Sequence, residues 1–369
     1  MILHLINNLN TGGAEKLMAT LLPELKSMGE NPVVVCLNNQ HDETIYQKLK
    51  EAAIPVYALK IIGSIYDFRL IFSLGRLIKK LNPEMIHVHL FPSFYWLAIC
   101  KILFRIKIPL LATEHGTYNR RMNHPLFGLI EKVIYKQYHH IICISNGVLD
   151  AMHQRFPNLS CEVIFNGIPL KPFKAAQIST SGETESFSQA SNLSERPTRL
   201  LSIGRLVKEK NHETLIRVMA KLPKEFHLTI AGEGDERGRI EQLIQELQVA
   251  NQITMLGNVA DVVKLIQETD IGLLCSKQEG FGLAAVEIMA GKKPVVLTRI
   301  PGLAELIPDT SLSADVGDVD KISAIILRLN ADTTYYETMA EKCFEKAQLF
   351  SIQKMAQGYF SCYQRLRKK

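Results

Sequence analysis

A chain of 369 residues is too long for one ordinary compact domain and suits two, because such domains cluster near roughly 100 to 200 residues. Its composition, 47% hydrophobic and 22% charged, excludes a disordered or collagen-like chain and predicts a globular protein. The formal net charge of +6 is unevenly distributed, since twelve Lys or Arg stand against four Asp or Glu between Lys60 and Lys136.

The cysteines and the N-terminus predict a cytoplasmic protein. The seven cysteines lie mostly in apolar runs without Cys-x-x-Cys spacing, so we expect buried thiols in a reducing compartment. The start, Met1 to Asn8, lacks the basic residues and cleavage site of a signal peptide and predicts a first strand. The longest apolar run, Leu90 to Leu111, is interrupted by Lys101, Arg105 and Lys107, so we expect no membrane span.

In the first half of the chain, short apolar runs alternate with stretches of helical period, which is typical of βαβ units and a parallel sheet. The predicted strands are Ile2 to Ile6, Pro32 to Leu37, Pro55 to Ala58, Met85 to Val88, Pro109 to Thr113 and His140 to Ile144. Helices such as Ala14 to Met28 and Phe68 to Lys80 lie between them.

A second series of the same kind follows a polar, Ser-rich segment. Its predicted strands are Arg199 to Ile203, His227 to Ala231, Ile253 to Leu256, Ile271 to Cys275 and Pro294 to Leu297, and a last helix is predicted from Lys354 to Lys369. The sequence therefore predicts an α/β protein with two doubly wound domains. We expect the first domain over residues 1–173, a linker over 174–197, the second domain over 198–350 and a C-terminal helix over 351–369.

Glycines follow the first predicted strand. Gly12 and Gly13 open a helix, and there backbone N–H groups can approach an anion or a sugar. The spacing differs from the Gly-x-Gly-x-x-Gly of a dinucleotide fold, and an ordinary turn is an equally good interpretation.

Two cations follow the first strand of the second domain. Gly204 and Arg205 come directly after that strand and Lys210 lies five residues later, so that one loop presents two positive charges where a diphosphate could bind. A charged surface loop is the alternative.

The segment from Ser276 to Ala290 carries two carboxylates. Glu279 precedes Gly280, Phe281, Gly282 and Leu283 at the start of an apolar helix, and Glu287 lies on that helix. Free N–H groups at a helix start can hold a phosphate, and a carboxylate further along can accept hydrogen bonds from a ribose. A helix-surface glutamate is the alternative for Glu287, but an unpaired charge among apolar neighbours is costly.

These motifs together resemble the retaining glycosyltransferases of the GT-B fold, in the large family four of bacterial polysaccharide and glycolipid transferases. The resemblance covers the whole chain. The matching segments, in order, are Gly12 to Glu15, Thr113 to Gly116, Ile144 to Gly147, Val163 to Ile168, Gly204 and Arg205 with Lys210, Ala231 to Gly234, and Glu279 to Glu287.

The resemblance implies a role for each site residue. Arg205 and Lys210 would neutralise the donor diphosphate, Glu287 would bind the ribose, and Glu279 would hold sugar hydroxyls. It also implies that His115 reaches the sugar from the first domain, in a cleft between the two domains. Gly12 and Gly13 would let the first domain close on the donor, and Gly280, Phe281, Gly282 and Leu283 would offer backbone contacts.

No cofactor or metal is expected. Fixed cations and N–H groups can stabilise the charge of a departing nucleoside diphosphate without a divalent ion. Asp318-Val319-Asp320 has the spelling of a metal motif, but we interpret Asp318 as a helix N-cap. The hydrolase scheme of paired carboxylates is rejected for Glu279 and Glu287 because of the adjacent cations; the resemblance implies a substrate-assisted retaining path.

The basic first domain raises the hypothesis of a membrane surface. Lys132 and Lys136, with Arg120, Arg121 and His124, are interleaved with apolar residues, which is compatible with peripheral binding to an anionic inner leaflet. A solvated helix face is the alternative. A nucleic-acid partner is not expected, because the usual recognition patterns are missing from the sequence.

We therefore predict a transferase that moves a sugar from a nucleotide-sugar, first a UDP-hexose or UDP-N-acetylhexosamine and then GDP-mannose, to a saccharide or lipid-linked acceptor. Two other functions stay open. One is an inactive nucleotide-sugar-binding subunit, since fold does not fix function. The other is a sugar-nucleotide epimerase of similar architecture, which would need no acceptor.

Overall fold

A computed structural model describes residues 1–10, 12–59, 64–117, 125–173, 196–259 and 261–368, in two compact units. Unit 1 comprises Met1–Gly167 and Ile352–Lys369, and unit 2 comprises Ile168–Ser351. Most of the predicted linker, 174–197, lies outside the described residues, as do Arg120, Arg121 and His124. Unit 2 begins before that segment, because Ile168 pairs with Ser351 and its N–H donates to the Phe350 carbonyl at 3.0 Å.

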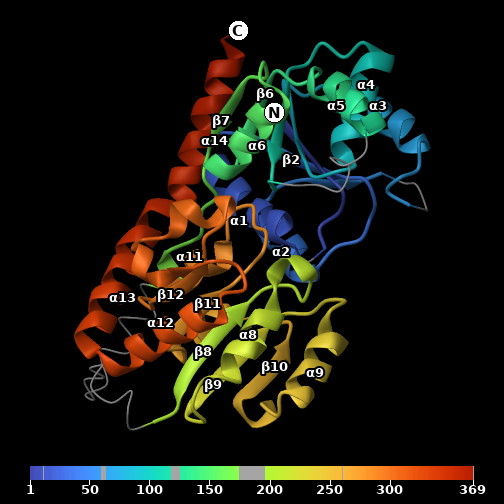
Figure 1. Cartoon of the computed structure of the whole chain (residues 1–369). Coiled ribbons are helices and arrows are strands. Elements are labelled where there is room, and N and C mark those ends of the chain that lie inside the picture. Colours follow the sequence, from blue (N-terminus) through green and yellow to red (C-terminus); the bar gives the residue numbers. More distant parts are fainter. Residues whose placement is uncertain (11, 60–63, 118–124, 174–195, 260, 369) are drawn as a thin grey trace. The chain divides into compact units, whose positions relative to one another are not determined.

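Unit 1, coloured blue to green in Figure 1 with α14 in red, contains a parallel sheet. Its seven described strands have the order β3-β2-β1-β4-β5-β6-β7. The strands are β1 (Ile2–Ile6), β2 (Pro32–Cys36), β3 (Val56–Ala58), β4 (Met85–His89), β5 (Leu110–Glu114), β6 (His140–Cys143) and β7 (Cys161–Val163). The helices are α1 (Gly13–Ser27), α2 (Glu43–Glu51), α3 (Arg69–Leu81), α4 (Ser93–Phe104), α5 (Pro125–Tyr135), α6 (Asn146–Arg155) and α14 (Ile352–Arg367).

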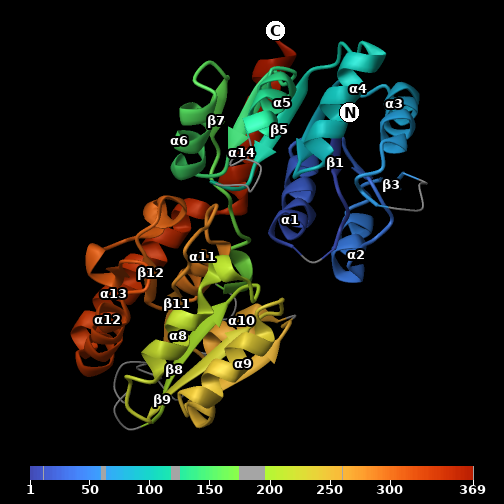
Figure 2. The same cartoon turned by 45° about the vertical axis from the view of Figure 1, so that its right-hand side comes forward.

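Helix α14 belongs to unit 1 although the preceding chain runs through unit 2; Figure 2 draws it in red beside the green strands of unit 1. Its buried side chains, among them Met355, Tyr359 and Tyr363, join one hydrophobic core with residues of α1, α2 and the central strands. At its end, Arg367 bonds Glu30 at 2.5 and 2.7 Å and Glu84 at 2.8 Å, and Glu84 also accepts from the Met1 amine at 2.7 Å. Ion pairs and apolar burial together fasten both chain ends to one unit.

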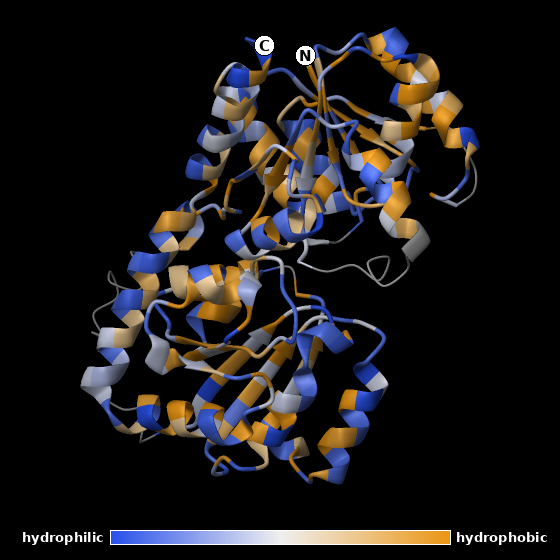
Figure 3. Cartoon of the chain, turned by 45° about the horizontal axis from the view of Figure 1, so that its top comes forward, coloured by the Kyte–Doolittle hydropathy of each residue, from blue (hydrophilic) through white to orange (hydrophobic). Residues whose placement is uncertain are grey.

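Unit 2 contains a second parallel sheet, whose described strands have the order β10-β9-β8-β11-β12-β13. They are β8 (Thr198–Ile203), β9 (Phe226–Ala231), β10 (Ile253–Gly257), β11 (Ile271–Leu274), β12 (Val295–Thr298) and β13 (Ser313–Ala314). Its α-helices are α8 (His212–Met219), α9 (Arg237–Glu246), α10 (Val262–Gln267), α11 (Leu283–Ala290), α12 (Val319–Ala331) and α13 (Thr333–Ala347). The strands are mostly hydrophobic in Figure 3, as parallel strands covered on both faces must be.

The predicted fold class is confirmed, since both sheets are parallel and doubly wound. The predicted strands are present, with each end at the predicted residue or one residue away, whereas β7 and β13 were not predicted. Both are edge strands of two or three residues, too short to show a periodicity. Asp318 is the N-cap of α12, as expected, and accepts from the Lys321 N–H at 2.9 Å.

Candidate donor site

The candidate site in unit 2 lies where the strand order reverses. From β8 the chain continues to β9 on one side, while β11 pairs with β8 on the other, so the loops after β8 and β11 begin at neighbouring strand ends. In doubly wound sheets ligands bind at this switch point, beyond the carboxyl ends of the strands. The loops in question are Gly204 to Lys210 and Ser276 to Gly282.

Lys210 and Glu279 form an ion pair across these two loops. Glu279 is well buried and also accepts from the Ser276 hydroxyl at 3.0 Å, while Lys210 is partly exposed. The cation and the carboxylate that the sequence assigns to donor binding are thus brought together. The ammonium is held in a fixed place by its partner, as charge stabilisation in a site requires.

The backbone fixes the two loops to each other. The Glu209 carbonyl accepts from the N–H groups of Lys277 at 2.8 Å and Gln278 at 3.3 Å. Asn211 is buried with a positive φ of 54°, and its side-chain amide donates to the Cys275 carbonyl at 3.1 Å. Sequence reasoning missed Asn211; its signal is a short polar residue, tolerant of left-handed backbone, directly before a helix.

Arg205 is exposed at the end of β8 and lies next to the contact between two loops. The Gly204 N–H donates to the Ala231 carbonyl at 3.0 Å. A Cβ on Gly232, whose φ is +146°, would lie only 2.0 Å from the Gly204 oxygen. Gly232 is therefore required for the loop after β9 to pack against the loop that carries Arg205.

The segment before α11 has the geometry of an anion seat. Gly282 is the N-cap with a φ of +87°, the helix starts at Leu283, and Glu287 lies one turn further, half-buried. The Phe281 side chain is buried and meets the Phe350 ring edge to face at 5.2 Å between ring centres, so Phe281 can offer a ligand only its backbone.

Gly302, after β12, supports this segment and was also missed from the sequence. A Cβ at this position would lie 1.9 Å from the Glu279 carbonyl oxygen. Only a glycine lets the turn Pro301 to Leu306 approach the Glu279 backbone so closely. The signal in the sequence is a Pro-Gly pair that begins three residues after the end of a strand.

In unit 1, the predicted residues lie at the carboxyl ends of strands. Gly12 is the N-cap of α1 in extended backbone, and a Cβ there would lie 2.2 Å from a Glu15 carboxylate oxygen, whereas Gly13 faces open space. His115 follows β5; its Nε2 is buried without a hydrogen-bond partner, and burial lowers its pKa to about 4. His115 is therefore neutral near pH 7.

His89, at the end of β4, is a further candidate that sequence reasoning missed. Its ring lies 5.8 Å from that of His115, and its Nδ1 has no hydrogen-bond partner. The alternation His87-x-His89 at a strand end was the available signal, because residues two apart share one face of a sheet.

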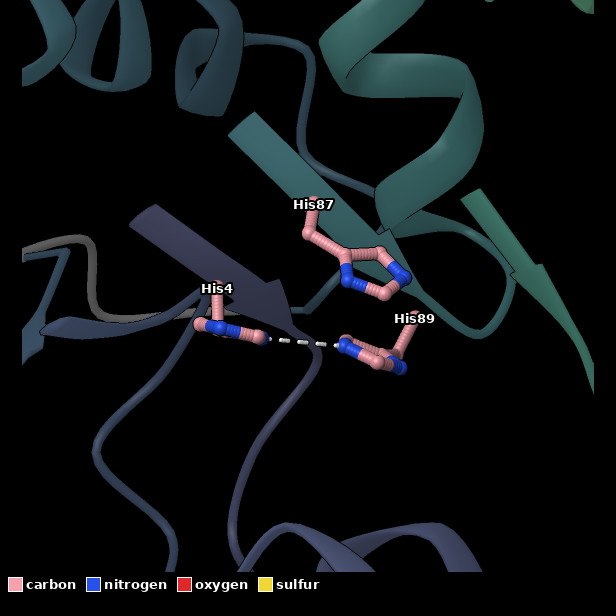
Figure 4. Close-up of side chains that lie close together, drawn as sticks. All are labelled: His4, His87 and His89. Atoms are coloured by element: carbon pink, nitrogen blue, oxygen red, sulfur yellow. Dashed lines mark hydrogen bonds between the residues drawn. The ribbon is translucent and has the colours of Figure 1, made fainter. Parts of the chain in front are cut away.

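His4, His87 and His89 lie close together on β1 and β4 (Figure 4), and Tyr363 of α14 bonds His87. His4 Nδ1 lies 3.3 Å from His89 Nε2, and the His87 nitrogens bond the Tyr363 and Thr113 hydroxyls, each at 2.7 Å. Burial lowers the pKa of His4 to about 3 and the pKa values of His87 and His89 well below the ordinary range. The cluster is an uncharged hydrogen-bonded layer between sheet and helix.

Two groups of described residues have ligand atoms close enough to hold a metal ion: this histidine cluster and His140 with Glu162 and Cys362. In the first, both His87 nitrogens already bond hydroxyls. In the second, Glu162 bonds Arg365 at 2.5 Å and pairs with His140 at 3.0 Å. Neither group contains Lys210 or Glu279.

Within the described residues, no helix has the length and apolarity needed to cross a bilayer.

Comparison with known proteins identifies the family of the chain. The family model "Glycosyltransferase Family 4" matches residues 11–171 and the model "Glycosyl transferases group 1" matches residues 183–348. The chain is 24% identical to N-acetyl-alpha-D-glucosaminyl L-malate synthase of Bacillus anthracis, over 81% of this chain and 79% of that protein. It is 25% identical to alpha-monoglucosyldiacylglycerol synthase of Streptococcus pneumoniae, over 90% and 79%.

Two solved structures share the fold across both units. A glycosyltransferase of Rickettsia africae aligns with a TM-score of 0.80 at 21% identity, covering 100% of this chain and 98% of that chain. Anabaena Alr3699/HepE, solved in complex with UDP and glucose, aligns with a TM-score of 0.82 at 21% identity, covering 98% and 99%.

Two doubly wound units matched by these models define a glycosyltransferase of the GT-B type. The chain belongs to glycosyltransferase family four, which confirms the resemblance carried by its motifs and the prediction of a transferase enzyme. The roles of the individual site residues stay predictions.

Proposed function

We propose that this glycosyltransferase transfers a hexose or N-acetylhexosamine, with retention, from a UDP-sugar to a saccharide or lipid-linked acceptor in cell-surface polysaccharide or glycolipid synthesis. The observation that carries the proposal is the Lys210–Glu279 ion pair at the switch point. Its carboxylate, Glu279, lies four residues before the first residue of α11, Leu283. Cation, N–H groups and carboxylate are the groups that a nucleotide-sugar diphosphate and its sugar hydroxyls need.

The charge of the leaving group decides which residues matter. When the sugar departs, negative charge grows on the nucleoside diphosphate, and Lys210 with the exposed Arg205 would stabilise it. The α11 N-terminus adds N–H groups and the helix dipole. With this charge supplied by the protein, we propose transfer that needs no divalent metal.

Support for the donor and acceptor comes from related proteins. HepE, which shares the fold, was solved with UDP-glucose. The names of two relatives specify a diacylglycerol product and a diphospho-undecaprenol acceptor. We therefore place a lipid-linked saccharide or lipid first among acceptors and propose that the enzyme works in the cytoplasm at the membrane surface, with no nucleic-acid partner.

Two other functions would treat the same donor differently. An inactive subunit would bind UDP-sugar without releasing UDP, and an epimerase would convert the donor with no acceptor present. UDP release that depends on acceptor is expected only for the transferase.

A proton NMR spectrum of the product tests retention, since the anomeric configuration of the donor must be kept.

The first experiment is a thermal-shift panel with UDP, GDP, ADP and several nucleotide-sugars. A ligand at a hundred times its Kd stabilises the folded state by about 2.7 kcal/mol, so a bound nucleotide raises Tm measurably. We expect UDP compounds to give the largest shift, reduced in Arg205→Ala and kept in Arg217→Ala, an arginine on α8 away from the site loops. A larger shift with GDP would replace the donor assignment, and no shift with any nucleotide would contradict the site.

A further inference from the structure

Unit 1 exposes large apolar side chains on neighbouring helices. Helix α3 packs against α4, and α4 packs against α5, as Figure 1 also shows. Phe68 at the α3 N-cap is 66% exposed, Leu103 in the last turn of α4 58%, and Leu129 and Val133 on α5 64% and 54%. We call the exposed apolar side chains of these helices the α3–α5 face: Phe68, Phe72, Ile102, Leu103, Phe127, Leu129, Ile130 and Val133.

These residues are more than the scattered apolar side chains of an ordinary surface. Scattered single ones are normal, whereas several on adjoining helices indicate a surface that another molecule covers. Phe72 meets Phe104 edge to face at 6.1 Å between ring centres, and the Lys79 ammonium lies 5.5 Å from the Phe104 ring centre. The apolar side chains are thus continuous from α3 to α4.

The charge on and around the face is mostly positive. The acidic residues that flank α3, Asp67 and Glu84, are paired with Arg69 and Arg367. Exposed cations on and beside the three helices are Arg69, Arg76, Lys79, Lys80, Arg105, Lys107, Lys132 and Lys136. The sequences of α3, α4 and α5 contain one acidic residue, Glu131, which is fully buried and paired with Arg155. In unit 2 the exposed helix α9 differs, because Arg237 pairs there with Glu233 and Glu241.

We infer that the α3–α5 face docks on a bilayer surface rich in anionic phospholipid. Exposed apolar side chains among the headgroups and lysine or arginine side chains against lipid phosphates are the two contributions that hold a protein at such a surface. The long Lys and Arg side chains can keep their charged ends at the phosphates while their stems cover apolar surface. The reason for docking, access to a lipid-linked acceptor, rests on the proposed function; the docking itself does not.

A second copy of the chain fits this face less well. If two copies met through it, each would bring its cations toward those of the other, with no exposed acid from these helices between them. Like charges brought together at an interface cost affinity, whereas an anionic bilayer neutralises them.

Co-sedimentation of the full chain with vesicles tests the inference. Vesicles of phosphatidylglycerol and phosphatidylcholine in equal parts are compared with vesicles of phosphatidylcholine alone. We expect binding only to the anionic vesicles, weakened by added salt because screening shortens the attraction. No binding to anionic vesicles at low salt would overturn the inference.

A pair of double variants assigns the binding to the α3–α5 face. Leu129→Glu with Val133→Glu changes exposed positions and should weaken vesicle binding by about tenfold or more. The matched control is Leu327→Glu with Leu349→Glu, two exposed leucines of unit 2, and should bind as the parent does. Equal binding by both double variants overturns the inference, as does a dimer that only the first double variant dissociates in gel filtration.

Acceptor-dependent UDP release with a detergent-dispersed acceptor separates the two proposals. Vesicle binding without any transfer would contradict the proposed function and leave the docking face in place. Transfer without vesicle binding would contradict the docking face and leave the proposed function in place.

Discussion

At the scale of single residues, the Lys210–Glu279 pair is the contact on which the proposed donor site rests. A buried carboxylate beside a lysine holds the ammonium in place, but it also competes with an incoming phosphate for that charge. A sugar hydroxyl that donates to Glu279 would occupy the carboxylate while the phosphate takes the lysine. The two halves of a nucleotide-sugar would then be bound by the two members of one ion pair.

Replacement of Lys210 tests this arrangement. We expect Lys210→Ala to lower kcat/KM by at least about tenfold, which corresponds to about 1.4 kcal/mol of lost transition-state stabilisation. Lys208→Ala is the matched control, since Lys208 is an exposed lysine of the same short 3-10 helix and should act near the parent rate. Steady-state UDP release measures both variants. Equal effects of the two changes would mean that net charge of the loop, rather than the Lys210 position, matters.

Glu287 is the second residue whose role can be tested by one substitution. Its place one turn into α11, half-buried among apolar neighbours, fits a carboxylate that accepts from ribose hydroxyls. We expect Glu287→Ala to lower turnover by at least about tenfold at limiting donor, with Glu246→Ala on exposed α9 as control. Full activity in a folded Glu287→Ala protein would remove the ribose assignment.

At the scale of elements, close backbone contacts position the loops that carry these side chains. Gly302 lies against the Glu279 carbonyl and Gly232 against the Gly204 carbonyl, so loops after four different strands meet. Each contact is possible only because glycine has no Cβ. Each glycine also lies far in sequence from the residue whose carbonyl it contacts.

Gly302→Ala should therefore damage the site without touching a ligand. Because the added Cβ would lie 1.9 Å from the Glu279 oxygen, the loop must shift and the Lys210–Glu279 pair with it. We expect kcat/KM to fall by about tenfold or more, since small displacements of a site residue are costly. Gly238→Ala is the control: it adds a Cβ into open space within α9, so activity should be kept and stability should rise by about 0.5–1 kcal/mol. If Gly302→Ala retains parental kinetics, the support argument fails.

The same contacts show where sequence reasoning stops. Strands and helices with clear periodicity were predictable, as was the Glu279 to Glu287 segment, because its chemistry lies within consecutive residues. Asn211 and Gly302 were not, since each acts through a carbonyl of a segment distant in sequence. The His87-x-His89 alternation indicated only a shared sheet face for the two histidines; that the His89 ring lies 5.8 Å from the His115 ring follows from the pairing of β4 with β5.

At the scale of the whole molecule, unit 1 is built from both ends of the chain. Helix α14 contributes Tyr359 and Tyr363 to the core, and the Tyr363 hydroxyl bonds His87. The chain after unit 2 must therefore return before unit 1 is complete. The interface that it forms contains buried, uncharged histidines, which links the stability of unit 1 to pH.

Stability of unit 1 should fall as pH drops below the ordinary histidine pKa. In the unfolded chain these histidines take up protons near pH 6.5, whereas in the folded unit the pKa is lowered to about 3 for His4 and about 4 for His115. The unfolded state then binds more protons, so each such histidine removes up to about 1.4 kcal/mol of unfolding free energy per pH unit. The contribution of the neutral buried histidines to stability is fully present above pH 6.5. It is lost as the pH falls toward the pKa values of these histidines in the folded unit.

Urea unfolding of the full chain, followed from about pH 7 to about pH 5, measures this dependence. We expect His4→Asn to lower stability at pH 7 but to reduce the steepness of its fall with pH by about one proton equivalent, because one buried neutral histidine is gone. His153→Asn, which changes an exposed histidine on α6, should leave the steepness unchanged. A parental profile that is flat over this range would show that the cluster is already charged in the folded state, and would contradict the assignment of an uncharged layer beneath α14.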